Sequence, residues 1–300
     1  KLPLKNVPIT LAHALSPRGC FHSEFTIMRE SEDSFYIVSA GAAQRLDHDW
    51  IKKHMPTDRS VTFTDLTNSM GVLVLAGPKS RELLQRLTLT DLSNANFPWL
   101  SAQKIDVHLA PSIAARVNFV GELGWELHHP IEYQNHIFDA LFKAGEDLGI
   151  KPFGIRAMDA MRLEKSYRMV GTEMSIEYAA LESGLDRFVN MQKDDFIGRD
   201  GLAAWQEKGF NNSFVTLKVH DTVDADPIGG NPIYQNGELV GRCTSGGYGF
   251  RVGYSIALAM VKPELADIGQ IFEIDILGKR FKAEIIEESP FDPNNDCLRA

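Results

Sequence analysis

The chain has 300 residues, 44% of them hydrophobic and 24% charged, which is the composition of a globular protein with about two domains of roughly 150 residues each. Its net charge of −9 at pH 7 and its lack of a long Lys or Arg run exclude the basic footprint of nucleic-acid or anionic-membrane binding. Three widely spaced cysteines, Cys20, Cys243 and Cys297, argue against a disulfide framework or a CxxC zinc site and favour a reducing compartment.

The start of the chain, residues 1–10, has no apolar signal core, and no apolar stretch reaches the roughly 18 residues of a membrane span. This segment also lacks an initiator Met and reads as a loop that enters a strand. We therefore expect a fragment of a longer protein, located in the cytoplasm, or in the mitochondrial matrix if the source is eukaryotic.

The first elements are predicted from alternation and spacing. Residues 20–40 contain two β-rich runs around a polar turn, which predicts two antiparallel strands. A helix is expected over 42–55, where apolar residues recur at helical spacing. Strands are predicted over 61–67 and 71–78, and Pro78 is expected to be the first residue of the helix that follows.

The middle of the chain continues this mixed pattern. Residues 113–120 and 124–130 are predicted to form a pair of strands, and an amphipathic helix is expected over 132–150. A second helix is expected over 154–168.

From about residue 212 the sequence changes to short strands broken by turns, which predicts a small all-β unit. Asn236 and Gly237 carry the signal of a type I′ hairpin, and a second hairpin is expected at Gly278. We place the domain boundary within 205–213, so that the two predicted domains are 1–204 and 205–300.

Histidines and glycines give only weak evidence of a site. The nine His residues lack metal-ligand spacing, so structural or surface roles and no metal site are predicted. The adjacent His128 and His129 are expected to point to opposite faces of one strand. The glycine-rich run 244–253 has no following helix to bind a phosphate, and it indicates a tight corner of the β unit, with a role in lining a cleft as the alternative.

The segment "NFVGELGWELHHP", residues 118–130, carries the most mixed chemistry of the chain. Gly121 and Gly124 bracket a turn, and Trp125 and Glu126 must face opposite sides of the strand that follows it. If Trp125 packs in the core, Glu126 points into solvent or into a cleft. Residue type and spacing leave both possibilities open.

Glu24 is placed similarly, because "FHSEFTIM" puts Phe21 and Phe25 on one face of a strand and Glu24 on the other. A single carboxylate on a strand is weak evidence for a site. Two carboxylates on neighbouring strands of a half-buried sheet would form an acidic pocket for a ligand rich in N–H donors.

Several longer motifs occur in order along almost the whole chain: "ALSPRGCFHSEFTI", "NSMGVLVLAGPKSRELLQRLT", "NFVGELGWELHHP", "GIRAMDAMRLEKSYRMVGTEM", "LESGLDRFV" and "IALAMV". Together they resemble the folate-binding aminomethyltransferase family, whose type member is the T-protein of the glycine cleavage system. Within that family, "GELGWEL" and "RLEK" are similar to the C-terminal portion of dimethylglycine and sarcosine dehydrogenases.

The resemblance implies an α+β fold: a multi-part folate-binding region with ferredoxin-like α/β elements, followed by a C-terminal antiparallel β-barrel. It implies tetrahydrofolate as cofactor, bound in a central channel. It also implies that the chain begins part-way through the first domain of the family.

Site residues follow from the same resemblance. Glu126 matches the carboxylate that binds the pterin ring, and Glu24 lies where the family has an acidic residue near the reactive end of folate. Phe119 stands where the family usually has Tyr, Ala40 where the T-protein has Asn, and Met158 where it has Arg. We therefore expect Glu24 to be catalytic, and Glu126, Phe119 and Glu24 to contact folate.

The expected function is tetrahydrofolate-dependent one-carbon transfer in the C-terminal part of a dehydrogenase that demethylates dimethylglycine, sarcosine or a similar methylamine. FAD is expected only if an upstream domain on the same polypeptide exists. Two alternatives stay open: a stand-alone folate-dependent demethylase or aminomethyltransferase, and a catalytically silent homologue that acts as a binding module, which Phe119 and Ala40 suggest.

Overall fold

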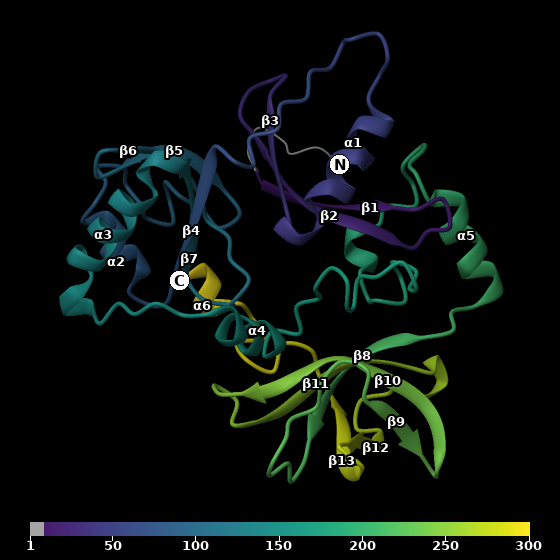
Figure 1. The fold of residues 1–300 in the computed structure, drawn as a ribbon. Coiled ribbons are helices and arrows are strands. Elements are labelled where there is room, and N and C mark those ends of the chain that lie inside the picture. The colour runs from purple at the N-terminus through teal and green to yellow at the C-terminus, as the bar shows by residue number, and fades with distance from the viewer. Residues whose placement is uncertain (1–8) are drawn as a thin grey trace. The chain divides into compact units, whose positions relative to one another are not determined.

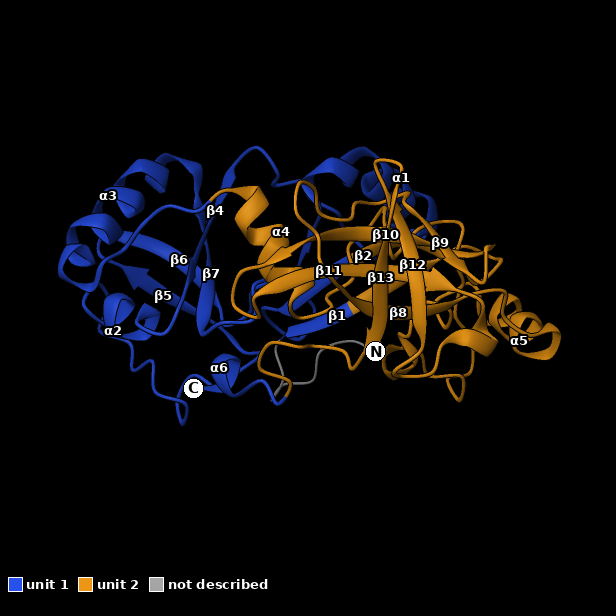
Figure 2. Ribbon diagram, turned by 90° about the horizontal axis from the view of Figure 1, so that it is seen from below, with its two compact units in different colours: residues 1–11, 25–153, 294–300 blue, residues 12–24, 154–293 orange. Residues whose placement is uncertain are grey.

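The computed structural model describes residues 9–300, and the prediction for the loop at the start of the chain lies outside them. The chain divides into two compact units, one with residues 1–11, 25–153 and 294–300, the other with residues 12–24 and 154–293 (Figure 2). The division cuts two strands, β1 (Ile9–Leu15) and β2 (Phe21–Arg29), so both contribute residues to both units. The domain boundary predicted after residue 204 stays a prediction.

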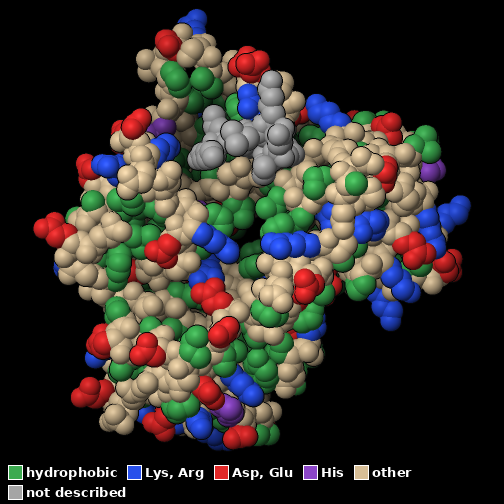
Figure 3. Space-filling view, turned by 180° about the vertical axis from the view of Figure 1, so that it is seen from behind, with side chains coloured by type: hydrophobic (Ala, Val, Ile, Leu, Met, Phe, Trp, Pro, Cys, Tyr) green, Lys and Arg blue, Asp and Glu red, His purple; other side chains and the backbone are tan. Residues whose placement is uncertain are grey.

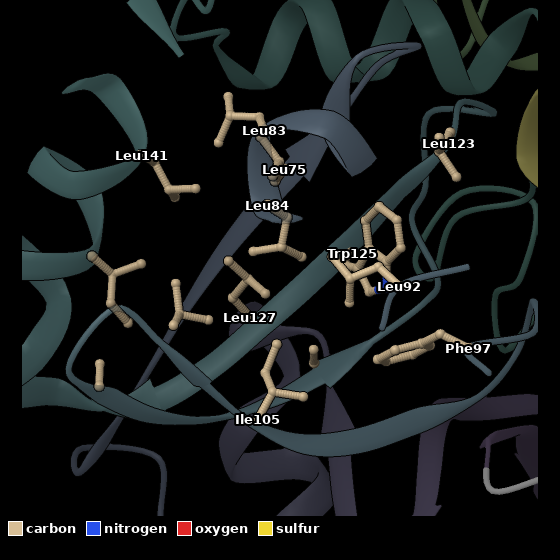
Figure 4. Close-up of a cluster of buried hydrophobic side chains, with 14 residues drawn as sticks. Leu75, Leu83, Leu84, Leu92, Phe97, Ile105, Leu123, Trp125, Leu127 and Leu141 are labelled. Carbon is tan, nitrogen blue, oxygen red and sulfur yellow. The ribbon is translucent and has the colours of Figure 1, made fainter. Parts of the chain in front are cut away.

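The first unit is built on a four-stranded antiparallel sheet in the order β4-β7-β6-β5 (Figure 1). Its elements are β4 (Met70–Ala76), α2 (Ser80–Gln85), β5 (Ala102–Val107), β6 (Ala110–Ala115), β7 (Gly124–Pro130), η2 (Ile131–Tyr133), α3 (Gln134–Ala144) and η3 (Glu146–Leu148). One face of the sheet packs on α2 and α3 through leucines such as Leu84 and Leu141, with Trp125 and Phe97 at the end of the same cluster (Figure 4).

The other face of this sheet is partly covered by the three-stranded sheet β1-β2-β3, whose third strand is β3 (Phe35–Ser39). Ile9, Met28 and Ala115 are buried there, and Tyr36 packs against them. The unit also contains η1 (Gly41–Ala43), α1 (Gln44–His54) and α6 (Asp296–Arg299).

The second unit contains a closed antiparallel barrel in the order β10-β11-β8-β13-β12-β9. Its strands are β8 (Ser213–Val219), β9 (Pro232–Gln235), β10 (Glu238–Gly249), β11 (Tyr254–Val261), β12 (Ile271–Ile276) and β13 (Lys279–Ile286), with η5 (Pro263–Leu265) between β11 and β12. Alternate residues such as Leu217, Ile233 and Phe272 fill its interior. The predicted α+β class with a C-terminal antiparallel barrel is confirmed.

Both predicted hairpins of the barrel are confirmed. Asn236 and Gly237 have φ of 52° and 84°, the two positive values of a type I′ turn, between the paired strands β9 and β10. Leu277 and Gly278 have φ of 52° and 79° between β12 and β13. Backbone twist therefore selects the same turn at both places, although leucine is poorly suited to the first position.

Replacing Leu277 with Asn is expected to stabilise the protein by about 0.5 to 1 kcal/mol, because Asn tolerates positive φ at lower strain. The Leu277 side chain is 83% exposed, so the substitution removes no core packing. The urea midpoint measures the change, and a midpoint below that of the parent protein contradicts it.

Outside the barrel, the second unit contains α4 (Ile155–Leu163), η4 (Asp186–Phe188) and α5 (Arg199–Lys208). A buried ionic network joins α4 to β10. Arg162, 1% exposed, donates from Nε to Asp159 over 2.6 Å and from Nη2 to Ser245 Oγ over 2.8 Å. Its Nη1 lies 3.3 Å from the carboxylate of Glu173, which is fully buried.

Glu173 accepts three further hydrogen bonds, from Met169 N, Thr172 Oγ1 and Ser245 Oγ. Burial by itself raises the pKa of Glu173, but the Arg162 charge and the hydroxyl donors outweigh it, so the pKa lies below the ordinary value of 4.5. The carboxylate is therefore held ionised inside the unit.

Several local predictions are wrong. Residues 61–67 form no strand, because they are mostly exposed, no strand pairs with them, and Asp65 accepts a hydrogen bond from Thr67 N in a turn. Pro78 precedes the helix, since α2 begins at Ser80 after the N-cap Lys79. The strand predicted over 113–120 ends at Ala115.

The two predicted helices of the middle region are shorter than expected. Residues 132–150 form the end of η2, then α3 and η3, because α3 ends at Ala144 with Gly145 as its C-cap. A Cβ at Gly145 would lie 2.4 Å from Leu83 Cδ1 and 3.0 Å from Ile150 Cβ, so any larger residue would have to displace neighbouring side chains. The helix predicted over 154–168 ends at Leu163, and Ser166 has φ of 54°.

Candidate functional site

Glu126 lies in the middle of β7, on the face of the sheet that α2 and α3 do not cover. It pairs with Val74 of β4 and Ala115 of β6, so its side chain stands between these two apolar neighbours. The Glu126 side chain is 24% exposed and Val74 is 43% exposed. The predicted alternation is confirmed, since Trp125 is fully buried on the opposite face.

Two side chains, His128 and Tyr36, form a row of contacts that begins at the Glu126 carboxylate. His128, two positions further along β7 and therefore on the same face, places Nε2 3.4 Å from Glu126 Oε2. The hydroxyl of Tyr36 lies 3.4 Å from His128 Nδ1. Burial raises the pKa of Tyr36, as do the nearby carboxylates of Glu30 and Glu126, so the phenol remains protonated.

Trp125, on the opposite face of β7 from Glu126, packs against one aromatic ring and two arginines. Trp125 meets the edge of Phe97 at a centroid distance of 6.1 Å, and the guanidinium carbons of Arg81 and Arg116 each lie 5.8 Å from its ring. Burial lowers the pKa of Arg116 to about 10, assisted by the positive charge of Arg81. A pocket of about 620 Å³ is lined by Arg81 and other α2 residues and does not include Glu126.

The segment between β6 and β7 is a loop organised by Asn118. Its Oδ1 accepts hydrogen bonds from Val120 N and Gly121 N, and its Nδ2 donates to Glu122 O over 2.7 Å. Gly121 has φ of 75°, which favours glycine. Phe119 therefore lies partly buried in a loop and not in the predicted strand.

Glu24 lies on β2, and its side chain is 24% exposed. His13 of β1 places Nε2 3.2 Å from Glu24 Oε1. The His13 ring is itself held edge-on between Phe21 and Phe188, at centroid distances of 5.4 and 5.0 Å. One oxygen of Glu24, Oε1, is thus in contact with His13.

The three residues singled out from the sequence fall in different places. Glu126 and Phe119 belong to the first unit and Glu24 to the second, so each is described within its own unit. His13, His128 and Tyr36 were not identified from the sequence. Strand parity already places His128 beside Glu126, whereas no spacing rule connects residues 13 or 36 to a partner.

The chemistry available at Glu126 is acceptance of hydrogen bonds next to an apolar surface. A partly exposed carboxylate beside an exposed valine fits a flat ring that has an edge of N–H donors. Within residues 9–300 no three His, Cys, Asp or Glu side chains are grouped to hold a metal ion. Basic and acidic side chains are interspersed on the face shown in Figure 3.

Within the part of the chain that the structure describes, every helix is too short or too polar to cross a bilayer.

Two family models match the chain: the GCVT N-terminal domain over residues 2–193 and the glycine cleavage T-protein C-terminal barrel domain over residues 212–292. The human protein named "Dimethylglycine dehydrogenase, mitochondrial" is 38% identical over 280 residues, which cover 93% of this chain and 32% of that protein. This chain thus spans about a third of the length of that relative.

Stand-alone relatives match as well. An aminomethyltransferase of Desulfitobacterium hafniense is 30% identical over 88% of this chain and 71% of its own length. The crystal structure of the glycine cleavage system aminomethyltransferase T from Bartonella henselae superposes with a TM-score of 0.83 over 97% of this chain and 78% of that one. At 19% sequence identity this last match shows the fold alone.

Proposed function

Because this chain belongs to the glycine cleavage T-protein family of folate-dependent aminomethyltransferases, we propose that it transfers one-carbon units to tetrahydrofolate as part of a dimethylglycine- or sarcosine-type dehydrogenase. The family resemblance supplies the cofactor class. The 38% identity to human dimethylglycine dehydrogenase favours this branch.

The observation that carries the proposal is the environment of Glu126. A pterin has an amidine-like pair of N–H donors on a flat ring, and one carboxylate accepts both in a charge-assisted contact. Val74, exposed beside Glu126, offers the apolar surface against which such a ring packs. The donor pair of a pterin therefore matches the Glu126 carboxylate, and its flat ring matches the apolar surface of Val74.

Glu24 is proposed to act on the reacting atoms. Its carboxylate would stabilise a developing cation or take up the proton that the attacking N5 amine releases. His13, hydrogen-bonded to Oε1, would hold the carboxylate in one orientation. Phe119 is proposed to contact folate without the hydroxyl that a tyrosine would supply, so proton transfer would not pass through that position.

In the proposed dehydrogenase, an FAD-dependent domain outside this chain would oxidise the N-methyl amine, and this chain would pass the one-carbon unit to folate. A mitochondrial matrix location would follow for a eukaryotic source. The second candidate is a stand-alone aminomethyltransferase, favoured by the Desulfitobacterium relative, of which the chain covers 71%.

Replacing Glu126 with Ala in the full-length protein is expected to weaken tetrahydrofolate binding about ten- to hundredfold, which corresponds to the loss of about 1.5 to 3 kcal/mol of charge-assisted hydrogen bonding. Isothermal titration calorimetry measures the dissociation constant. The matched control is Glu132→Ala, which removes an exposed carboxylate just beyond the same strand. No binding by the parent protein, or equal binding by Glu126→Ala, rejects the proposed site.

A further inference from the structure

We propose that His128 is a positioning residue, held by Tyr36, that fixes the Glu126 carboxylate in the orientation required to recognise the pterin edge. The inference rests on the proposed function, because it assigns His128 a role through Glu126. It concerns a side chain to which the family resemblance gives no role and for which the sequence pattern predicts only a structural or surface one.

Burial makes His128 unsuited to bind the ligand itself. The side chain is fully buried, between Val72 of β4 and Ile113 of β6, with which it is in register on the neighbouring strands. The Tyr36 ring meets it edge-on at a centroid distance of 5.5 Å and an interplanar angle of 86°. Any influence of His128 on a bound ligand must therefore pass through Glu126.

The hydrogen-bonding pattern selects one tautomer. A neutral imidazole has one N–H donor and one acceptor nitrogen. Because the Tyr36 phenol stays protonated, it can donate to Nδ1, and the proton then resides on Nε2, which faces Glu126 Oε2 at 3.4 Å. The opposite tautomer would direct a lone pair at a carboxylate.

The contact between His128 and Glu126 is long in this structure. His128 Nε2 is buried and makes no well-aligned hydrogen bond, although Oε2 lies at 3.4 Å. A carboxylate that rotates slightly toward the histidine would satisfy this donor. Its remaining lone pairs would then be directed at the ligand, so ordering of Glu126 and ligand binding support each other.

A double-mutant cycle on the full-length protein tests the inference with tetrahydrofolate as the ligand. His128→Phe keeps the ring and removes both nitrogens, and it is expected to raise the dissociation constant about three- to tenfold. In the Glu126→Ala background the same substitution is expected to change the dissociation constant less than twofold, because the residue through which His128 acts is gone. His128→Gln, which retains a donor, is expected to recover most of the affinity.

The possible outcomes separate this inference from the proposed function. If Glu126→Ala leaves binding unchanged, the proposed function fails. If Glu126→Ala weakens binding but His128→Phe weakens it equally in both backgrounds, His128 acts on the fold and the inference fails. Should His128→Phe not fold, Tyr36→Phe takes its place in the cycle, with an expected two- to threefold loss in the parent background only.

Discussion

Turnover is expected to fall about a hundredfold when Glu24 is replaced by Gln, whereas tetrahydrofolate affinity is expected to change less than threefold. General acid–base groups contribute about 10² to 10⁴ to rate, and the amide cannot accept the proton. Gln keeps the shape of the side chain and an oxygen for His13, which contacts Glu24 Oε1 at 3.2 Å. Steady-state transfer of the one-carbon unit to tetrahydrofolate by the full-length protein gives kcat and KM separately.

The matched control for this prediction is Glu207→Gln, which changes an exposed carboxylate of α5 in the same unit and is expected to leave kcat unchanged. An unaltered kcat in Glu24→Gln contradicts a role for Glu24 in proton transfer. A parent protein that binds tetrahydrofolate but shows no turnover supports the catalytically silent alternative.

The second large effect is on stability. Arg162→Met is expected to destabilise the second unit by about 3 to 5 kcal/mol, because it leaves the fully buried Glu173 carboxylate without its cation. Met fills part of the volume, so the loss is mainly electrostatic. Hydrogen exchange of the α4 and β10 amides measures the free energy of opening within this unit.

The pH dependence of this effect has a defined sign. In the parent protein the pKa of Glu173 lies below 4.5, so its contribution to stability is complete above that value and is lost as the pH falls through the folded-state pKa. In Arg162→Met, burial without the arginine charge is expected to raise the pKa of Glu173. Protonation of the Glu173 carboxylate then removes the cost of burying an unpaired charge. The difference in the free energy of opening between the parent protein and Arg162→Met is expected to be largest at pH 7 and to become smaller toward pH 4.5.

Arg280→Met is the control, because Arg280 and its partner Glu273 are 37% and 54% exposed. Exposed pairs contribute about 0.2 to 1 kcal/mol, so this variant is expected to remain within that range at every pH. Equal losses in Arg162→Met and Arg280→Met contradict the assignment of a buried ionic network.

Much of the fold follows from local rules that the sequence displays. Asn236 and Gly237 predict their hairpin because few residues accept two successive positive φ values. The opposite orientation of Trp125 and Glu126 follows from the period of a strand. Residues 61–67 look like a strand but have no partner, and partners depend on tertiary structure that local alternation cannot reveal.

The site was predictable in part. Residue type and spacing left Glu24 and Glu126 undecided between solvated and functional carboxylates, and the family resemblance gave them roles that stay predictions. His13 could not be found, because its pairing with Glu24 depends on how β1 and β2 lie together. The end of the strand at Ala115 was missed because a turn follows at once, in which Val117 N donates to Ala115 O, and Asn118 then organises the loop.

The discontinuous composition of both units has a consequence for synthesis of the chain. The second unit needs residues 12–24 together with residues 154–293, which are made later, and the first unit needs residues 294–300. Arg116, for example, donates a hydrogen bond over 2.9 Å to the backbone oxygen of Ala300, and this contact cannot form until residue 300 has been synthesised. During translation neither unit can be completed until nearly all of these residues have left the ribosome, so this part of the nascent chain is expected to depend on protection from aggregation until then.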